Sequence, residues 1–182
     1  MPRLRDALTS SARPVLVEVL DDGPIDTMDA EELSSSCRTA GAAALLLSAS
    51  LLGPVAAEQA LADGSFPGPL PLVFDLRSSD LNELPGGSDC PDLASLHRAG
   101  ASAVAVLGAA LLVGGAVAAA DAVASAQLAG LDVVVLVGSA TDGAAAEAAG
   151  ACAVVYDPSL SAELSATPPG PAGESQGEGE GE

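Results

Sequence analysis

One loop in the C-terminal half of the chain has the composition of an anion-binding turn. The segment 138–143 (Gly-Ser-Ala-Thr-Asp-Gly) follows an apolar run and leads into an Ala-rich stretch. A glycine-rich turn at a helix N-terminus offers backbone amides to a phosphate group, so Gly138, Ser139 and Gly143 are candidate phosphate-binding residues. The loop lacks the lysine of a P-loop, and Asp142 would itself occupy the positive end of the helix. An N-capped helix start is therefore the competing interpretation, and the one that we prefer.

Carboxylates form the second group of residues that could bind a ligand or take part in a reaction. Glu18 lies in an apolar run, and five aspartates fall at or just after expected strand ends: Asp21, Asp22, Asp75, Asp80 and Asp157. Oxygen ligands of this kind suit Mg²⁺ or Ca²⁺, but no ligand loop of recognised spacing is present. We therefore expect an acidic rim of solvated carboxylates with no cation beside it, and no metal site.

The remaining reactive residue types are few. Three cysteines, Cys37, Cys90 and Cys152, are widely separated without a CxxC pattern, so we expect ordinary thiols and neither a zinc site nor a disulfide framework. The only histidine, His97, lies in an Ala/Leu-rich helical stretch and is expected to be a surface or half-buried helix residue. The six basic residues are all arginine, so Schiff-base and lysine-acid chemistry is excluded. No cofactor is implied.

Charge and hydropathy limit the partners. The 182-residue chain has a formal net charge of −19, which argues against nucleic acid and anionic membranes and favours a basic protein partner. Residues 99–120 carry no charge, which meets the length criterion for a membrane span. Because this stretch is mostly Ala and Gly, we expect a strand, a loop and a helix start instead of a span.

Short apolar runs alternate with Ala-rich helical stretches along most of the chain. The runs are continuous instead of alternating in polarity, as in a parallel sheet covered by helices. Gly41 and Gly100 are expected to close the preceding helices in left-handed geometry. Strands are expected at 14–20, 43–48, 70–76, 101–107, 133–137 and 152–156, and helices at 28–40, 55–62, 91–98, 117–128 and 142–149. This pattern of six strands and five helices fits a doubly wound sheet or part of a (β/α)8 barrel.

Composition divides the chain into three parts. Residues 1–13 lack the apolar core of a secretory signal, and a transit-peptide remnant is one interpretation of them. Residues 14–160 hold the strands and helices. Residues 161–182 contain a Pro/Gly cluster and a Gly-Glu repeat, so we expect a disordered acidic tail, either solubilising or interacting with a basic partner.

The order of three motifs resembles indole-3-glycerol-phosphate synthase, the barrel enzyme of tryptophan biosynthesis. The motifs are Arg13-Pro14-Val15-Leu16-Val17-Glu18-Val19-Leu20, Ala99-Gly100-Ala101 with the run to Leu111, and Ala129-Gly130-Leu131-Asp132 with the run to Val137. The resemblance covers about residues 7–160. It implies an α/β fold, a partial (β/α)8 TIM-barrel-like domain.

The resemblance also implies a site from which most residues are missing. The family uses two lysines and two glutamates for proton transfer, and only one glutamate position matches, as Glu18. Leu20 replaces the first-strand lysine, and Asp75 stands at the third-strand lysine in the ungapped match, or Phe74 if the aspartates are aligned. Strands seven and eight, which carry the family's phosphate site, are not reached before the tail. Glu18 is thus a retained catalytic carboxylate or a polar strand-end residue, and we prefer the second interpretation.

Three functions follow from these observations. The first, which we prefer, is a catalytically silent pseudoenzyme fragment with a structural or protein-interaction role, whose partner is a chain that completes the barrel or a basic protein. The second is a partly active synthase, a carboxy-lyase that closes the indole ring, from an incomplete gene. The third is a phosphate-binding α/β module centred on 138–143. The resemblance favours a plastid location, with the cytoplasm as the alternative.

Overall fold

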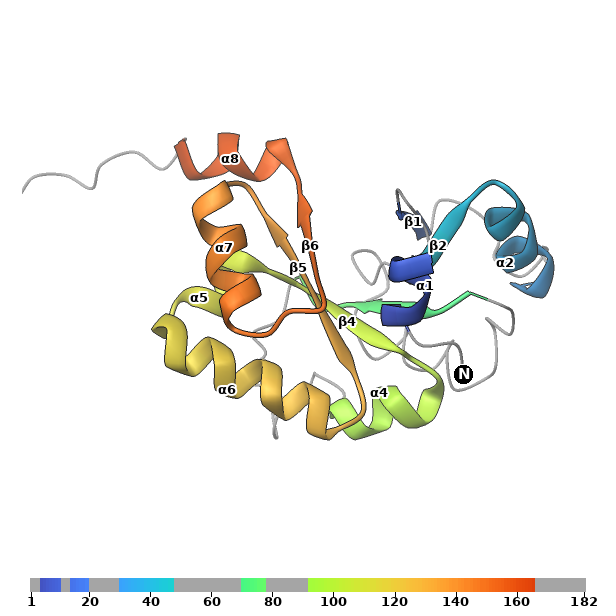
Figure 1. The fold of residues 1–182 in the computed structure, drawn as a ribbon, viewed down its shortest axis with the longest axis horizontal. Helices are drawn as coiled ribbons and strands as arrows, with labels where there is room; N and C mark the ends of the chain where they lie inside the picture. The colour runs from blue at the N-terminus through green and yellow to red at the C-terminus, as the bar shows by residue number, and fades with distance from the viewer. Residues whose placement is uncertain (1–3, 11–13, 20–29, 48–69, 78–91, 166–182) are drawn as a thin grey trace, which may run out of the picture.

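The computed structural model describes residues 4–10, 14–19, 30–47, 70–77 and 92–165. Its centre is one six-stranded sheet in which every strand is parallel and lies beside the preceding one (Figure 1). The strands are β1 (Val15–Val19), β2 (Ala42–Leu47), β3 (Leu72–Asp75), β4 (Ala103–Leu107), β5 (Asp132–Val137) and β6 (Ala153–Tyr156). The sheet curls into a half-barrel, so the predicted α/β, partial-barrel fold class is confirmed.

Seven helices occur in the described residues. They are α1 (Leu4–Ser10), α2 (Ala30–Thr39), α4 (Leu93–Ala99), α5 (Gly108–Leu112), α6 (Gly115–Leu128), α7 (Ala140–Ala148) and α8 (Pro158–Ser165). Four of these, α2, α4, α6 and α7, correspond to predicted helices, and the predicted helix at 55–62 lies outside the described residues. Three helices, α1, α5 and α8, were not predicted. Helix α8 crosses the expected start of the tail at residue 161, and residues 166–182 lie outside the description.

The outer face of the sheet is packed against helices. Alternate strand residues such as Phe74, Val104 and Val135 point to this side, because successive side chains in a strand face opposite ways. They meet Leu96 of α4 and Val123 of α6, and Phe74 is completely buried. This outer layer holds most of the large buried side chains and is the larger of the two cores.

The inner face is covered differently. It is formed by smaller residues, among them Ala44, Ala103 and Ala105, and Leu4 of α1 packs against it with 1% exposure. Arg5 then holds α1 at the amino-terminal end of the sheet, since its Nε donates to Asp132 Oδ1 at 2.9 Å. Helix α1 lies beside β2 in Figure 1. The short N-terminal helix therefore covers part of the inside of the half-barrel.

The helix-closing glycines behave as predicted. Gly41 has φ of 97° and Gly100 has φ of 117°, both in the left-handed region. At Gly100 the backbone amide donates to the carbonyl of His97, and the following Ala101 enters the sheet layer fully buried. Each glycine thus ends a helix and turns the chain directly into the next strand.

The uncharged stretch 99–120 contains the end of α4, strand β4, helix α5 and the start of α6. Within the described residues, no helix combines the length and apolar character needed to span a bilayer.

Candidate functional site

The most polar feature of the inner face is an ion-pair cluster at the carboxyl-terminal end of β1 and β3. Asp75 is the last residue of β3 and is only 4% exposed. Arg77 folds back over it: Nε lies 3.0 Å from both Asp75 carboxylate oxygens, and Nη2 lies 2.8 Å from Oδ2. The Arg77 backbone amide also donates to Asp75 Oδ1 at 2.9 Å. A buried carboxylate is tolerated here because charged donors surround it.

The same guanidinium reaches a second carboxylate. Arg77 Nη2 donates to Glu18 Oε1, although Glu18 belongs to β1 and strand β2 lies between β1 and β3. The alternation of side chains along each strand places Glu18 and Asp75 on the inner face, next to Leu16 and Val73 of the inner core. Arg77 therefore joins the carboxyl-terminal ends of the first and third strands across the second.

Arg77 remains a cation in this setting. The hydrogen bonds that it donates to Asp75 raise its pKa most, and the charges of Asp75 and Glu18 raise it further, against the lowering effect of burial. A guanidinium with a raised pKa keeps its protons, so Arg77 can neutralise carboxylates and hold an anion but cannot act as a general acid.

The positive charge of Arg77 also affects Asp157 at the end of β6. Asp157 directly follows β6, and its pKa is lowered chiefly by hydrogen bonds from the Ser159 hydroxyl (2.6 Å) and the Ser159 amide (2.9 Å), with a smaller contribution from the charge of Arg77. The curl of the sheet thus brings the end of β6 within electrostatic range of the Arg77 cluster.

One prediction about this rim was wrong. The acidic residues were expected to have no cation beside them, whereas Arg77 pairs with Asp75 and Glu18. The signal was present, since Arg77 follows Asp75 by two residues, but the contact to Glu18 spans 59 positions and depends on strand order. The other expected rim residues, Asp21, Asp22 and Asp80, lie outside the described residues. Within the described ranges no three potential metal ligands come together.

The predicted phosphate loop is occupied by groups of its own chain. Ser139 is the N-cap of α7: its hydroxyl accepts from the Asp142 amide at 3.1 Å and donates to Asp142 Oδ2 at 2.7 Å. The Asp142 carboxylate therefore lies at the positive end of α7. This is the geometry of the N-capped helix start.

The two glycines of this loop lie against neighbouring segments. The carbonyl of Gly138 accepts from the Ser161 hydroxyl of α8, and a Cβ at Gly138 would come 2.7 Å from the Ser161 backbone nitrogen. A Cβ at Gly143 would overlap the Tyr156 hydroxyl oxygen. Gly138 therefore contacts α8, Ser139 caps the start of α7, and Gly143 lies against Tyr156 of β6.

The histidine and the described cysteines lie apart from this cluster. His97 is exposed on the last turn of α4, as predicted, with its ring beneath Gly130. Cys37 and Cys152 are free, half-buried thiols, and Cys90 lies outside the described residues. Burial, and secondly the charge of Asp132, raise the pKa of Cys152 to about 11. A thiol with this pKa is protonated at neutral pH and is a poor nucleophile.

No family model matches this chain, and no curated protein matches it. The resemblance to indole-3-glycerol-phosphate synthase therefore stays a prediction.

Proposed function

We propose that this chain is a catalytically silent half-barrel, related to the indole-3-glycerol-phosphate synthase type, whose role is structural and carried out by pairing with another chain. The observation that carries the proposal is the contact between Arg77 and Glu18, the one carboxylate at a catalytic position of that family. A proton-transferring carboxylate must gain and lose a proton during turnover. The Arg77 guanidinium occupies Glu18 Oε1, an oxygen through which that proton would be exchanged with a substrate.

The open sheet supports the second part of the proposal. Within the described residues, β1 and β6 each pair with one neighbour only. The Cys152 amide donates to the Val133 carbonyl at 2.8 Å. Since alternate amides of a parallel strand face opposite sides, the amides of Ala153 and Val155 face away from β5. An edge of this kind is a template for pairing with a further strand.

Helix α6 adds apolar surface suited to a partner. Val117 and Leu128 are 77% and 90% exposed, and eleven residues of separation places them on nearly the same face of the helix at 3.6 residues per turn. The exposed Ala124 lies between them on this face, and Asp121 is the only charged residue of α6. Asp121 lies on nearly the same face between the two large side chains, so this surface is small and supports pairing less than the open edge of β6 does.

The catalytic half of the proposal is tested by assay of the purified full-length chain with carboxyphenylamino-deoxyribulose phosphate, the family's substrate. We expect no turnover above the buffer control. Turnover that disappears in Glu18→Gln would refute the proposal, because it would show that Glu18 still transfers protons.

Analytical ultracentrifugation of the purified chain tests whether it pairs with another chain. In this experiment the other chain is a second copy of the same protein. We expect a dimer at micromolar concentrations that strengthens with salt, because salt screens the repulsion between two chains of charge −19. The variant Ala153→Pro removes an outward-facing amide and should weaken the dimer at least about 10-fold. Its unfolding midpoint should be unchanged at concentrations where the unaltered chain is also monomeric.

The neighbouring variant Cys152→Pro is the matched control. It removes the amide that bonds to Val133 inside the sheet, so it should lower stability instead. A chain that is monomeric at every concentration and salt, or a dimer that Ala153→Pro leaves unchanged, would contradict pairing through the β6 edge.

A further inference from the structure

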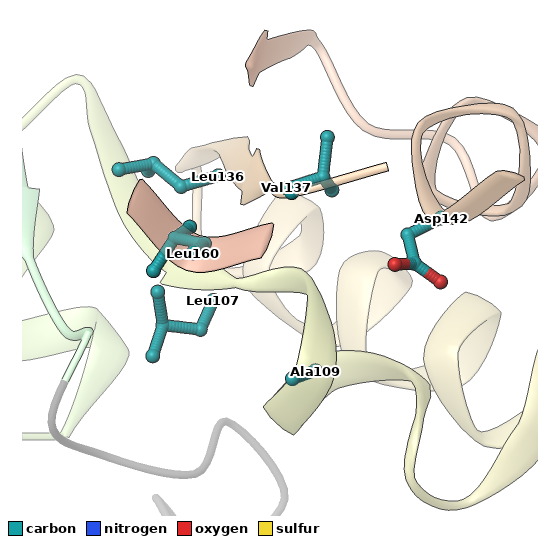
Figure 2. A pocket seen from close by; sticks show the side chains of 7 residues that line it. Leu107, Ala109, Leu136, Val137, Asp142 and Leu160 are labelled. Carbon is teal, nitrogen blue, oxygen red and sulfur yellow. The ribbon is translucent and has the colours of Figure 1, made fainter. Parts of the chain in front are cut away.

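A pocket of about 180 Å³ opens at the carboxyl-terminal ends of β4 and β5. Its walls come from Leu107 of β4, Leu136 and Val137 of β5, Ala109 of α5, Asp142 of α7 and Leu160 of α8. Figure 2 shows the three leucines gathered on one side and the Asp142 carboxylate on the other. In parallel α/β sheets, ligands bind beyond the carboxyl ends of the strands, so the pocket lies where this architecture accepts small molecules.

The size of the pocket limits its ligand. An apolar cavity of about 150 Å³ accommodates a benzene ring. A pocket of about 180 Å³ therefore holds one ring or one branched chain with a short substituent, and a nucleotide or a sugar phosphate is too large to enter it whole.

The lining chemistry limits the ligand further. Asp142 contributes the only polar side chain, and the remaining side chains are aliphatic. Gly138 also lines the pocket, and its carbonyl already accepts a hydrogen bond from the Ser161 hydroxyl. An ionised carboxylate only accepts hydrogen bonds, so the polar end of a ligand must be a donor. A cationic donor forms the stronger, charge-assisted bond.

The Asp142 carboxylate is held in position before any ligand arrives. Ser139 donates to its Oδ2 at 2.7 Å, and the Asp142 amide bonds back to the Ser139 hydroxyl. In the described part of the chain, the ion pairs formed by Arg5, Arg77 and Arg98 involve other carboxylates. The net charge of −19 also raises the local concentration of cations and repels anions.

We propose that this pocket binds a small primary amine with an apolar ring or branched chain. The ammonium group bonds to Asp142, and the hydrocarbon packs against Leu107, Leu136 and Leu160. This inference goes beyond the structural role proposed above and does not depend on it. All residues that line the pocket belong to one chain, so binding can be measured whether or not the chain pairs with another.

The test uses the full-length chain labelled with ¹⁵N and three probes of one shape: benzylamine, benzyl alcohol and benzoate. We expect benzylamine to shift the amide signals of Gly138, Asp142 and Leu160 saturably. Benzyl alcohol should bind at least about 10-fold more weakly, because its neutral hydroxyl lacks the attraction between opposite charges. Benzoate should not bind, because its carboxylate is repelled by Asp142.

Three variants locate the site. Asp142→Asn keeps an acceptor for Ser139 but removes the charge, and should weaken benzylamine binding at least about 10-fold. Ala109→Leu adds a side chain at an exposed wall position and should abolish binding by filling the pocket. The matched control, Ala148→Leu, makes the same change at the exposed last residue of α7, which does not line the pocket, and should bind like the unaltered chain.

Several outcomes would overturn the inference. These are equal affinity for benzylamine and benzyl alcohol, binding that survives Ala109→Leu, and the absence of saturable shifts up to about 10 mM benzylamine, which corresponds to negligible affinity. If Asp142→Asn fails to fold because the α7 cap is weakened, the comparison of Ala109→Leu with Ala148→Leu decides the question alone.

Discussion

Replacing Arg77 with methionine isolates the contribution of the ion-pair cluster. The variant Arg77→Met keeps a long apolar stem and removes the guanidinium, so the side-chain bonds from Arg77 to Asp75 and Glu18 are lost. The backbone amide at position 77 still donates to Asp75 Oδ1. The experiment therefore removes charge compensation from a buried carboxylate while leaving one of its hydrogen bonds in place.

The structure sets the size of the expected effect. Removing one partner of a buried ion pair costs about 3–5 kcal/mol. Asp75 is 4% exposed, but Arg77 is 26% exposed, so water already screens part of the attraction. With that screening and the remaining amide bond, we expect a loss of about 2–3 kcal/mol in the free energy of unfolding at pH 7.

Urea unfolding followed by circular dichroism measures this loss. With a slope of about 2 kcal/mol per molar urea, the midpoint should fall by about 1–1.5 M. Glu18→Gln is the control: Glu18 is 37% exposed, and its loss should cost at most about 1 kcal/mol.

A double variant completes the test. Asp75→Asn combined with Arg77→Met removes both charges and should be more stable than Arg77→Met alone, since no uncompensated carboxylate remains. An unchanged midpoint in Arg77→Met, or a double variant that is less stable than Arg77→Met, would refute the view that Arg77 stabilises the buried charge.

Three further substitutions test the packing and the helix ends. Asp92→Ala removes the α4 N-cap, whose carboxylate accepts from the Ala94 and Ser95 amides, and should cost about 1 kcal/mol at pH 7. The pKa of Asp92 is lowered in the folded chain, first by the Ser95 hydroxyl and then by the Ala94 amide. The cap therefore contributes stability above about pH 4, and this contribution is lost as the pH falls through the lowered pKa of the folded chain. A stability difference between the variant and the unaltered chain that persists in acid would contradict this origin. Leu4→Ala should lower the unfolding free energy by about 2–4 kcal/mol, because Leu4 is 1% exposed on the inner face. A loss below about 0.5 kcal/mol is typical of surface substitutions and would show that α1 does not cover that face in solution. Gly100→Ala places a Cβ at φ of 117° and should cost about 1–2 kcal/mol in the same urea assay, and an increase in stability would contradict the left-handed helix end.

The strands of the sheet could be predicted because each is marked by residues that are close together in the sequence. Each strand is a continuous apolar run, and Gly41 and Gly100 mark where two helices end. Long uncharged or Ala-rich stretches also identify α6 and α7 correctly. These signals need no knowledge of which strand lies beside which.

The missed features depend on contacts between distant segments. Helix α1 has only Leu4 and Leu8 as large apolar residues, too few to predict a helix until the inner face that buries them is known. Helix α8 did have a local signal, since Pro158 occupies its first position after Asp157, whose carboxylate bonds to Ser159. That signal was outweighed by the change in composition toward the tail.

The candidate site shows the same division. Ser139 as a helix cap could be predicted from its spacing to Asp142. The bond between Arg77 and Glu18 could not, because it requires β1, β2 and β3 to be adjacent in that order. The pocket at β4 and β5 likewise needs Leu160 of α8 as a wall, and α8 was not predicted.

The position of α1 connects an early and a late step of folding during synthesis. Every strand pairs with the one made just before it, so the sheet can grow from β1 onward as the chain lengthens. Helix α1 is the exception, because Arg5 bonds to Asp132, 127 residues later. Helix α1 can pack on β2 as soon as that strand has formed, but the bond from Arg5 to Asp132 must wait for β5. Protection of residues 4–10 from proteolysis on a nascent chain should therefore begin with β2 and increase when β5 joins the sheet.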